Sequence, residues 1–217
     1  GGALVVQSEN DSESFAIGID PTTGENLWRK MRHKGANWTS PIVIPGAQEV
    51  VALQSGKGLL GIIPKTGSEL WNYADGASTI PSSTSADGVV YIPSHGITAI
   101  KPSDKGGEPE QLWRNGQIGP GTGSPVVLGD KVYSVSKAGV LSASQTTDGE
   151  RLWRIRTDGP YSASPVVAGE HLYLFNEQGK GQIVRLSGEE GKVVSSIELE
   201  ETILCTPAIS GGALFVR

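Results

Sequence analysis

The stretch TTDGERLWRI at residues 146–155 decides the fold, because its pattern of a polar turn, a glycine and a tryptophan recurs along the chain. Three earlier stretches have the same pattern, the last in a longer form: 21–30, 64–73 and 102–115. The four tryptophans lie 43, 42 and 40 residues apart: Trp28, Trp71, Trp113 and Trp153. A nearly constant step of this size is typical of a repeat architecture.

A second landmark repeats with the same step. It is a Ser or Thr followed by Pro and then by apolar residues, and in one copy a second Ser stands where the proline is missing. The five copies are Ser40-Pro41, Ser82-Ser83, Ser124-Pro125, Ser164-Pro165 and Thr206-Pro207. Two independent landmarks with one period indicate true internal repeats.

Each repeat reads as four short strands. In residues 124–155 the segments SPVV, KVYSVS, VLSASQ and ERLWRI are separated by turns that contain glycine, and no segment has helical periodicity. This pattern predicts an all-β protein, a β-propeller of four-stranded antiparallel blades with about five repeats of ~42 residues. We place all of residues 1–217 in one domain. Its repeats are 1–30, 40–73, 82–115, 124–155, 164–197 and a partial 206–217.

The last hairpin of each repeat carries turn residues at fixed positions. Pro21 and Pro64 open two of these turns, and Gly24 and Gly67 close them. In the third repeat the turn is expanded to PSDKGGEPE, which we expect to be a surface excursion. In the fifth repeat a glycine keeps the turn position, but Ser195 stands where the tryptophan should be. A residue that one repeat can lose is more consistent with packing than with catalysis.

These hairpins resemble the repeat of the PQQ-like, or quinoprotein alcohol dehydrogenase-like, propellers. The signature of that family is Ala-x-Asp-x-x-x-Gly-x-x-x-Trp, the tryptophan-docking motif; here Gly18-x-Asp20 leads to Gly24 and Trp28. The resemblance implies that each indole packs between blades and that its N–H bonds to neighbouring backbone. The blade-docking residues would be Trp28, Trp71, Trp113, Trp153, Gly24, Gly67, Gly149 and Gly191.

Two branches of this family imply different functions. The quinone-dependent dehydrogenases hold PQQ with Ca²⁺ at the propeller axis, use an Asp as base and, in alcohol dehydrogenases, carry a disulfide between adjacent cysteines. BamB-like members are cofactor-free lipoproteins of the outer-membrane assembly machine that act as scaffolds. Cys205 is the single cysteine, so that disulfide is excluded, and we expect its thiol to be buried as a small apolar side chain.

The residues that could carry chemistry do not form a recognisable set. His33, His95 and His171 fall in different repeats, and most carboxylates lie in turns or in one acidic run. We therefore predict no catalytic, cofactor-binding or metal-binding residue and no cofactor, with PQQ and Ca²⁺ as the alternative. The net charge of −5 and the absence of a Lys/Arg cluster disfavour nucleic acid as a partner. No apolar run reaches the roughly 18 residues of a transmembrane segment.

The loops that join one blade to the next are the predicted interaction surface, because loops on a rigid scaffold often carry recognition. Trp38 and Tyr161 are the aromatic residues of these loops that could anchor a partner protein or peptide, although both could instead pack against a neighbouring blade.

The two ends of the chain repeat one strand, since GGALVV at 1–6 returns as GGALFV at 211–216. We expect part of a seven- or eight-bladed ring rather than a closed five-bladed one. A fragment of that kind could self-associate through open blade edges.

The sequence thus favours a non-enzymatic scaffold that binds proteins outside the cytoplasm, periplasmic by analogy with the family. Two alternatives stay open. One is a PQQ-dependent oxidoreductase domain whose cofactor residues lie partly outside this chain, and the other is a propeller that binds glycans or peptides.

Overall fold

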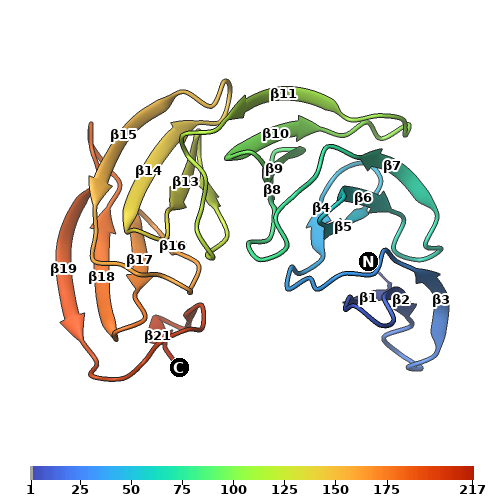
Figure 1. Ribbon diagram of the computed structural model, residues 1–217, viewed down its shortest axis with the longest axis horizontal. Helices are drawn as coiled ribbons and strands as arrows, with labels where there is room; N and C mark the ends of the chain where they lie inside the picture. The colour runs from blue at the N-terminus through green and yellow to red at the C-terminus, as the bar shows by residue number, and fades with distance from the viewer. Residues whose placement is uncertain (1) are drawn as a thin grey trace. The chain divides into compact units, whose positions relative to one another are not determined.

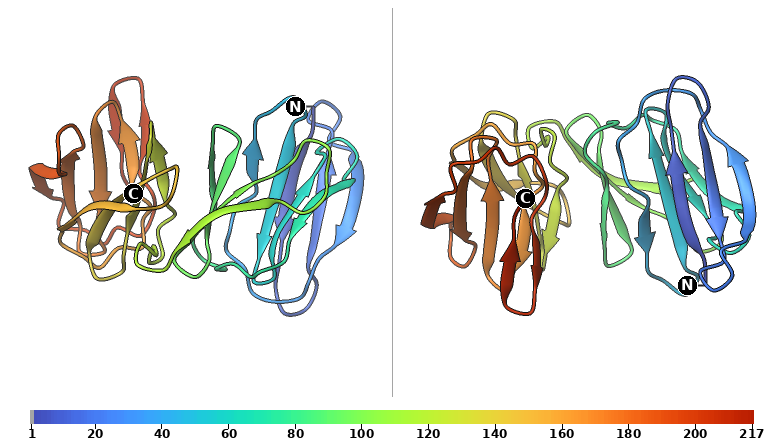
Figure 2. Two further views of the ribbon diagram at one scale, coloured as in Figure 1. Left: turned by 90° about the horizontal axis from the view of Figure 1, so that it is seen from above. Right: turned by 90° about the horizontal axis from the view of Figure 1, so that it is seen from below.

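The computed structural model describes residues 2–217, and every regular element within that range is a β-strand. Three sheets have four strands that follow one another in chain order and pair antiparallel. They are β4–β7 (Ile42–Ile44, Val50–Ser55, Gly58–Ile62, Glu69–Tyr73), β12–β15 (Val126–Leu128, Lys131–Val135, Val140–Gln145, Arg151–Arg156) and β16–β19 (Val166–Ala168, His171–Phe175, Lys180–Arg185, Lys192–Glu198). The predicted blade is confirmed (Figures 1 and 2).

A fourth four-stranded sheet, in the order β11-β10-β9-β8, comprises Thr84–Ala86, Val89–Pro93, Ile97–Lys101 and Glu110–Asn115. The two terminal sheets are smaller: β1–β3 (Leu4–Ser8, Phe15–Ile19, Asn26–Met31) and β20–β21 (Ala208–Ser210, Ala213–Phe215). The first predicted repeat therefore holds three strands instead of four, which correspond to the last three strands of a full blade. Gly1, which the prediction placed in this repeat, lies outside the described residues.

The contacts between Cα atoms divide the chain into two compact units. One contains the chain up to Ser94 together with Thr98–Leu112, and the other contains His95–Ile97 and Trp113–Arg217. The extent of the domain, the repeat boundaries and the number of blades in the ring stay predictions.

Within a blade, Trp28, Trp71 and Trp153 each stand opposite a small residue on the preceding strand. Gly18 pairs with Trp28, and Ala143 pairs with Trp153. A β-carbon on Gly18 would collide with the indole of Trp28, so the strand cannot carry a larger side chain there. In the fifth repeat the sizes are exchanged, because Ile183 stands opposite Ser195. The missing tryptophan is therefore accompanied by a larger residue on the facing strand.

Between blades, the indole of one sheet rests on the last hairpin turn of the next. The Nε1 of Trp28 donates to the carbonyl of Pro64 at 2.7 Å, and a β-carbon on Gly67 would lie 2.6 Å from its ring. Trp113 donates in the same way to the carbonyl of Thr146 at 2.8 Å. Gly67 has a φ of 68°, so this turn needs glycine both for its conformation and for the space that the indole occupies.

Trp71 differs from Trp28 and Trp113 in lacking this bond, and the expanded third turn is the reason. Gly107 of that turn donates to the carbonyl of Leu70 at 3.2 Å, so the extra residues fold back over β7. Within residues 2–217 the Nε1 of Trp71 has no hydrogen-bond partner, although the side chain is buried. The expanded turn has a different conformation, so it does not supply the carbonyl that would accept the N–H of this indole.

We expect Trp113→Phe to destabilise the protein more than Trp71→Phe by about 0.5–1.5 kcal/mol, which is the usual contribution of one hydrogen bond. Both substitutions remove the same atoms, but only Trp113 loses a bonded donor. Urea unfolding of the two variants, followed by far-UV circular dichroism, measures the difference. Equal losses, or a larger loss at Trp71, would contradict this account.

The Ser/Thr-Pro landmark joins neighbouring blades through its hydroxyl groups. The backbone N–H of Ser40 donates to Oγ of Ser82 at 2.9 Å. Ser124 donates to Oγ of Ser164 at 2.9 Å, and Ser164 donates to Oγ1 of Thr206 at 3.0 Å. In these three pairs the hydroxyl of one repeat accepts the N–H of the preceding repeat.

The missing proline of the second copy also has a physical reason. Ser83 donates both its N–H and its hydroxyl to Oε1 of Gln54, each at 2.7 Å. Proline has no N–H and could not form the first of these bonds.

Candidate functional site

Trp38 lies in the loop between β3 and β4, and its side chain is 69% exposed. Its backbone N–H donates to the carbonyl of Thr79 at 2.8 Å, in the loop between β7 and β8. Ile80 follows directly on that second loop and is 46% exposed. Two neighbouring inter-blade loops of one unit therefore each present an apolar side chain to solvent. Together with Lys34 and Lys57, which line the cavity described below, Trp38 and Ile80 form what we call the Trp38 surface.

Asn37 fixes the backbone next to Trp38. Its side-chain amide donates to Oε2 of Glu9 and to the carbonyl of Gln54, each at 2.9 Å. Its Oδ1 accepts the hydroxyl of Thr39 at 3.0 Å. These bonds tie the loop to β5 and to the turn that follows β1, so Trp38 is exposed on a backbone that is held in place.

A buried ion pair lies beneath the loop. The Nε of Arg32 is 2.7 Å from Oε1 of Glu9, and the two side chains are only 9% and 1% exposed. Arg32 also donates to the carbonyl of Leu53 at 3.3 Å. The negative charge of Glu9 is thus neutralised by Arg32 beneath the surface. We did not predict this pair, because no spacing in the sequence relates Glu9 to Arg32.

A cavity of about 250 Å³ opens at Asn37, the residue before Trp38. Its lining includes Glu9, Asn37, Thr79 and three residues with basic side chains: His33, Lys34 and Lys57. Both lysines are exposed, and within residues 2–217 neither forms an ion pair. The rim of this cavity therefore carries more positive than negative charge.

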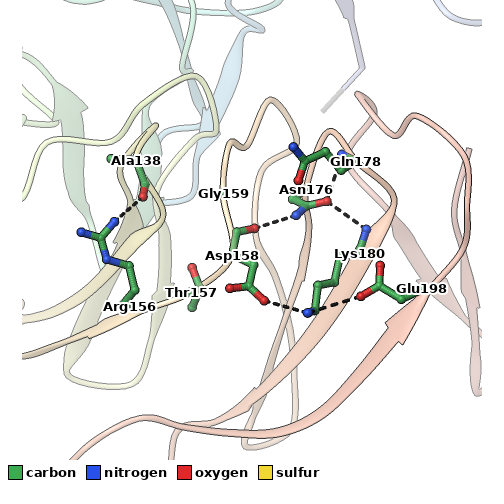
Figure 3. A pocket seen from close by; sticks show the side chains of 9 residues that line it. All are labelled: Ala138, Arg156, Thr157, Asp158, Gly159, Asn176, Gln178, Lys180 and Glu198. Carbon is green, nitrogen blue, oxygen red and sulfur yellow. Dashed lines mark hydrogen bonds and ion pairs between the residues drawn. The ribbon is translucent and has the colours of Figure 1, made fainter.

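The second unit holds a larger and more polar hollow of about 490 Å³ (Figure 3). In it Nζ of Lys180 is 2.8 Å from Oδ2 of Asp158 and 3.3 Å from Oε1 of Glu198. The hydrogen bond that Lys180 donates to Asp158, followed by the one it donates to Glu198, raises the pKa of Lys180 above its usual range. Arg156 donates to the carbonyl of Ala138 at 2.9 Å. Two cations and two carboxylates line this hollow, so their formal charges cancel.

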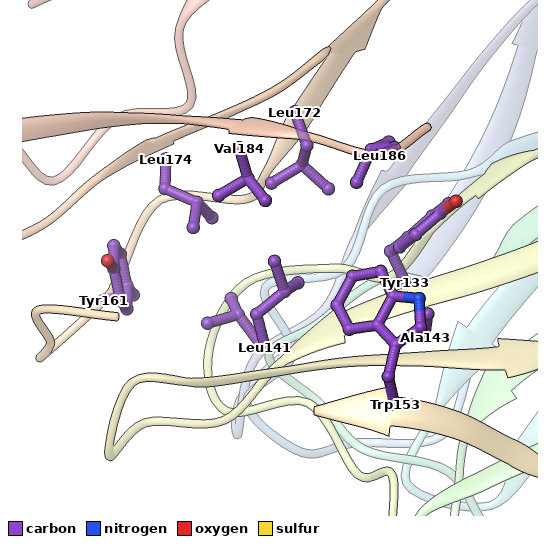
Figure 4. Close-up of a cluster of buried hydrophobic side chains, with 10 residues drawn as sticks. Tyr133, Leu141, Ala143, Trp153, Tyr161, Leu172, Leu174, Val184 and Leu186 are labelled. Carbon is purple, nitrogen blue, oxygen red and sulfur yellow. The ribbon is translucent and has the colours of Figure 1, made fainter. Parts of the chain in front are cut away.

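Tyr161, the other predicted anchor, is only 1% exposed, so that prediction is wrong. Its ring belongs to the buried cluster between β12–β15 and β16–β19 (Figure 4). Its hydroxyl donates to Oε1 of Gln182 at 3.1 Å, and burial raises its pKa. The two predicted anchors therefore have different environments, and they fall in different units.

Cys205 is exposed, which corrects the expectation of a buried thiol. Ile203 is the residue of this segment that turns inward, and it is almost fully buried.

Within residues 2–217, no group of three or more His, Cys, Asp or Glu side chains is placed to hold a metal ion. Whether a cofactor is bound stays a prediction. In the same range, no helix is long and apolar enough to cross a bilayer.

One comparison with known proteins identifies the family, and another concerns the fold. The family model described as outer membrane protein assembly factor BamB matches residues 1–103 and 94–194. Among solved structures, the chain is similar to the crystal structure of BamB from Moraxella catarrhalis, with 17% sequence identity and a TM-score of 0.74. The alignment covers 100% of this chain and 64% of that chain. At this identity the likeness concerns the fold. No curated protein sequence matches the chain significantly.

Proposed function

The chain belongs to the family of the outer membrane protein assembly factor BamB, and from this premise we propose that it is a non-enzymatic scaffold. In this proposal it binds other proteins outside the cytoplasm while outer-membrane proteins are assembled. The chain spans 64% of the length of the solved relative.

The observation that carries the proposal is the presentation of Trp38. Trp38 is exposed, and the adjacent Asn37 holds its backbone by hydrogen bonds to two neighbouring segments. Binding energy at protein interfaces is concentrated in a few residues, and Trp is enriched among them. The blades supply the rigid support, and the inter-blade loops supply the contact.

The test is complementation in the organism that carries the gene. We expect loss of the gene to lower the amount of folded outer-membrane β-barrel protein and the whole-length gene to restore it. Trp38→Ala should fail to restore it, whereas Leu152→Ala, which removes an exposed apolar side chain from β15, should succeed. Both variants must accumulate to the wild-type level in the periplasmic fraction. A protein confined to the cytoplasm, or a normal barrel level without the gene, would refute the proposal.

A second experiment distinguishes the scaffold from the alternative of an oxidoreductase. We expect the whole protein, incubated with PQQ and Ca²⁺, to show neither stoichiometric binding nor dye-linked alcohol oxidation. Either result would replace the scaffold by a quinone enzyme. No observation on the described residues favours that alternative.

A further inference from the structure

We propose that the Trp38 surface binds an acidic peptide segment in which a bulky apolar residue is flanked by Asp or Glu. The segment belongs to another protein. This inference rests on the proposed function and names the chemistry of the partner that the scaffold would recognise.

The apolar part of the surface explains the bulky residue. Trp38 and Ile80 are both exposed, and the hydrogen bond from the Trp38 N–H to the carbonyl of Thr79 keeps their two loops together. The cavity of about 250 Å³ is lined by Asn37 and Thr79, the residues that precede Trp38 and Ile80, and it has room for one large side chain. An aromatic anchor next to a small pocket is the usual arrangement of an interface hot spot.

The anchor is preorganised, which matters for affinity. The Arg32–Glu9 pair and the bonds of Asn37 hold the loop below Trp38. A loop that is already ordered loses little conformational entropy when a partner binds. Exposure of an apolar side chain on an ordered backbone is therefore better explained by recognition than by a mobile loop tip.

The charge of the surface selects an acidic partner. The whole chain carries a net charge of −5, yet Lys34 and Lys57 stand at the rim of this cavity. Glu9, the carboxylate that lines the same cavity, is already paired with Arg32. Opposite charges across an interface speed the encounter and reject partners of the wrong sign. The hollow around Lys180 has no such excess, because Asp158 and Glu198 flank its lysine.

The test uses the full chain and fluorescein-labelled peptides of about ten residues. The first peptide has one Leu among Glu and Asp residues; the second has Lys in place of the acids; the third has Ser in place of Leu. Fluorescence anisotropy at about 20 mM and about 500 mM NaCl measures Kd, since the Debye length falls below ~5 Å at the higher concentration. We expect binding of the first peptide only, and weaker binding at high salt.

The variants assign the binding to the surface. Trp38→Ala should raise Kd roughly 30-fold, the effect of a hot-spot residue. The pair Lys34→Glu and Lys57→Glu should raise it about 10-fold at low salt and less at high salt. The matched control, Lys105→Glu with Lys192→Glu, changes the net charge equally at two other exposed lysines and should leave Kd unchanged. Unchanged thermal unfolding shows that each variant is folded.

Three results would overturn the inference. They are equal binding of the basic peptide, equal Kd for the double charge reversal and its control, and binding of inorganic phosphate or anionic lipid vesicles as tight as that of the acidic peptide. The proposed function survives such a result if Trp38→Ala still fails in the complementation assay. If Trp38→Ala restores barrel assembly and also leaves peptide binding unchanged, both proposals are wrong.

Discussion

Trp153→Ala lowers the free energy of unfolding by about 3–5 kcal/mol, the range for truncating a buried large aromatic side chain. The indole is only slightly exposed and lies in the largest buried cluster of the second unit (Figure 4). It packs against Tyr133, with ring centroids 5.9 Å apart, and against Gly191 of the next sheet, where an added β-carbon would lie 2.5 Å from the ring. Alanine would leave a cavity between two blades, and neither sheet could close it without breaking its own strand pairing.

The measurement is urea unfolding followed by far-UV circular dichroism, with Leu152→Ala as the control. Leu152 is the preceding residue on β15 and is exposed, so its truncation should change the stability by no more than about 0.5 kcal/mol. A loss below about 1 kcal/mol at Trp153 would mean that the indole does not join the blades. Loss of partner binding at unchanged stability would mean that it has a recognition role instead.

Arg32→Met has a comparable expected effect, a loss of about 3–5 kcal/mol, because it leaves one charge of a buried ion pair without its partner. The carboxylate of Glu9 would keep the hydrogen bond from Asn37 but lose that from Arg32. Both side chains are nearly inaccessible to water, so solvent cannot replace the guanidinium. The loop that carries Trp38 should lose order at the same time.

The double variant Arg32→Met with Glu9→Gln tests this explanation. Gln is neutral and its oxygen can still accept the hydrogen bond from Asn37, so we expect the double variant to recover most of the lost stability. Hydrogen exchange at the amide of Trp38 should follow the same order: fast in the single variant and slow again in the double variant. If the double variant is as unstable as Arg32→Met, the loss comes from packing of the arginine side chain and not from the unpaired charge.

The four-stranded blade could be predicted from the sequence. The step of about 42 residues at the tryptophans and at the Ser/Thr-Pro pairs predicts both the four-stranded sheet and its repetition. The prediction succeeds because the interactions that build a blade are local. They are hairpin turns, alternating strands and one large residue opposite a small one, as in the pair Gly18 and Trp28. The family could be named from the same motif.

The candidate site could be predicted only in part. Trp38 stands out because it is the one tryptophan outside the repeat, and it is exposed. Tyr161 has the same kind of loop position but is buried, because Gln182 of β18 accepts its hydroxyl and lets the ring enter the core. Whether an aromatic loop residue faces inward or outward depends on a partner on another strand, which no repeat spacing specifies.

Which charged side chains are paired could be learned only from the folded structure. Glu9 and Arg32 are 23 residues apart and follow different strands, yet they form the buried pair beneath Trp38. Lys34 and Lys180 both look like exposed cations in the sequence, but two carboxylates flank only Lys180. The physical reason is the range of the interactions. The repeat depends on contacts within a hairpin and between equivalent turns, so its residues recur at a fixed spacing. The charge of a surface depends on side chains that come together only after the blades have packed.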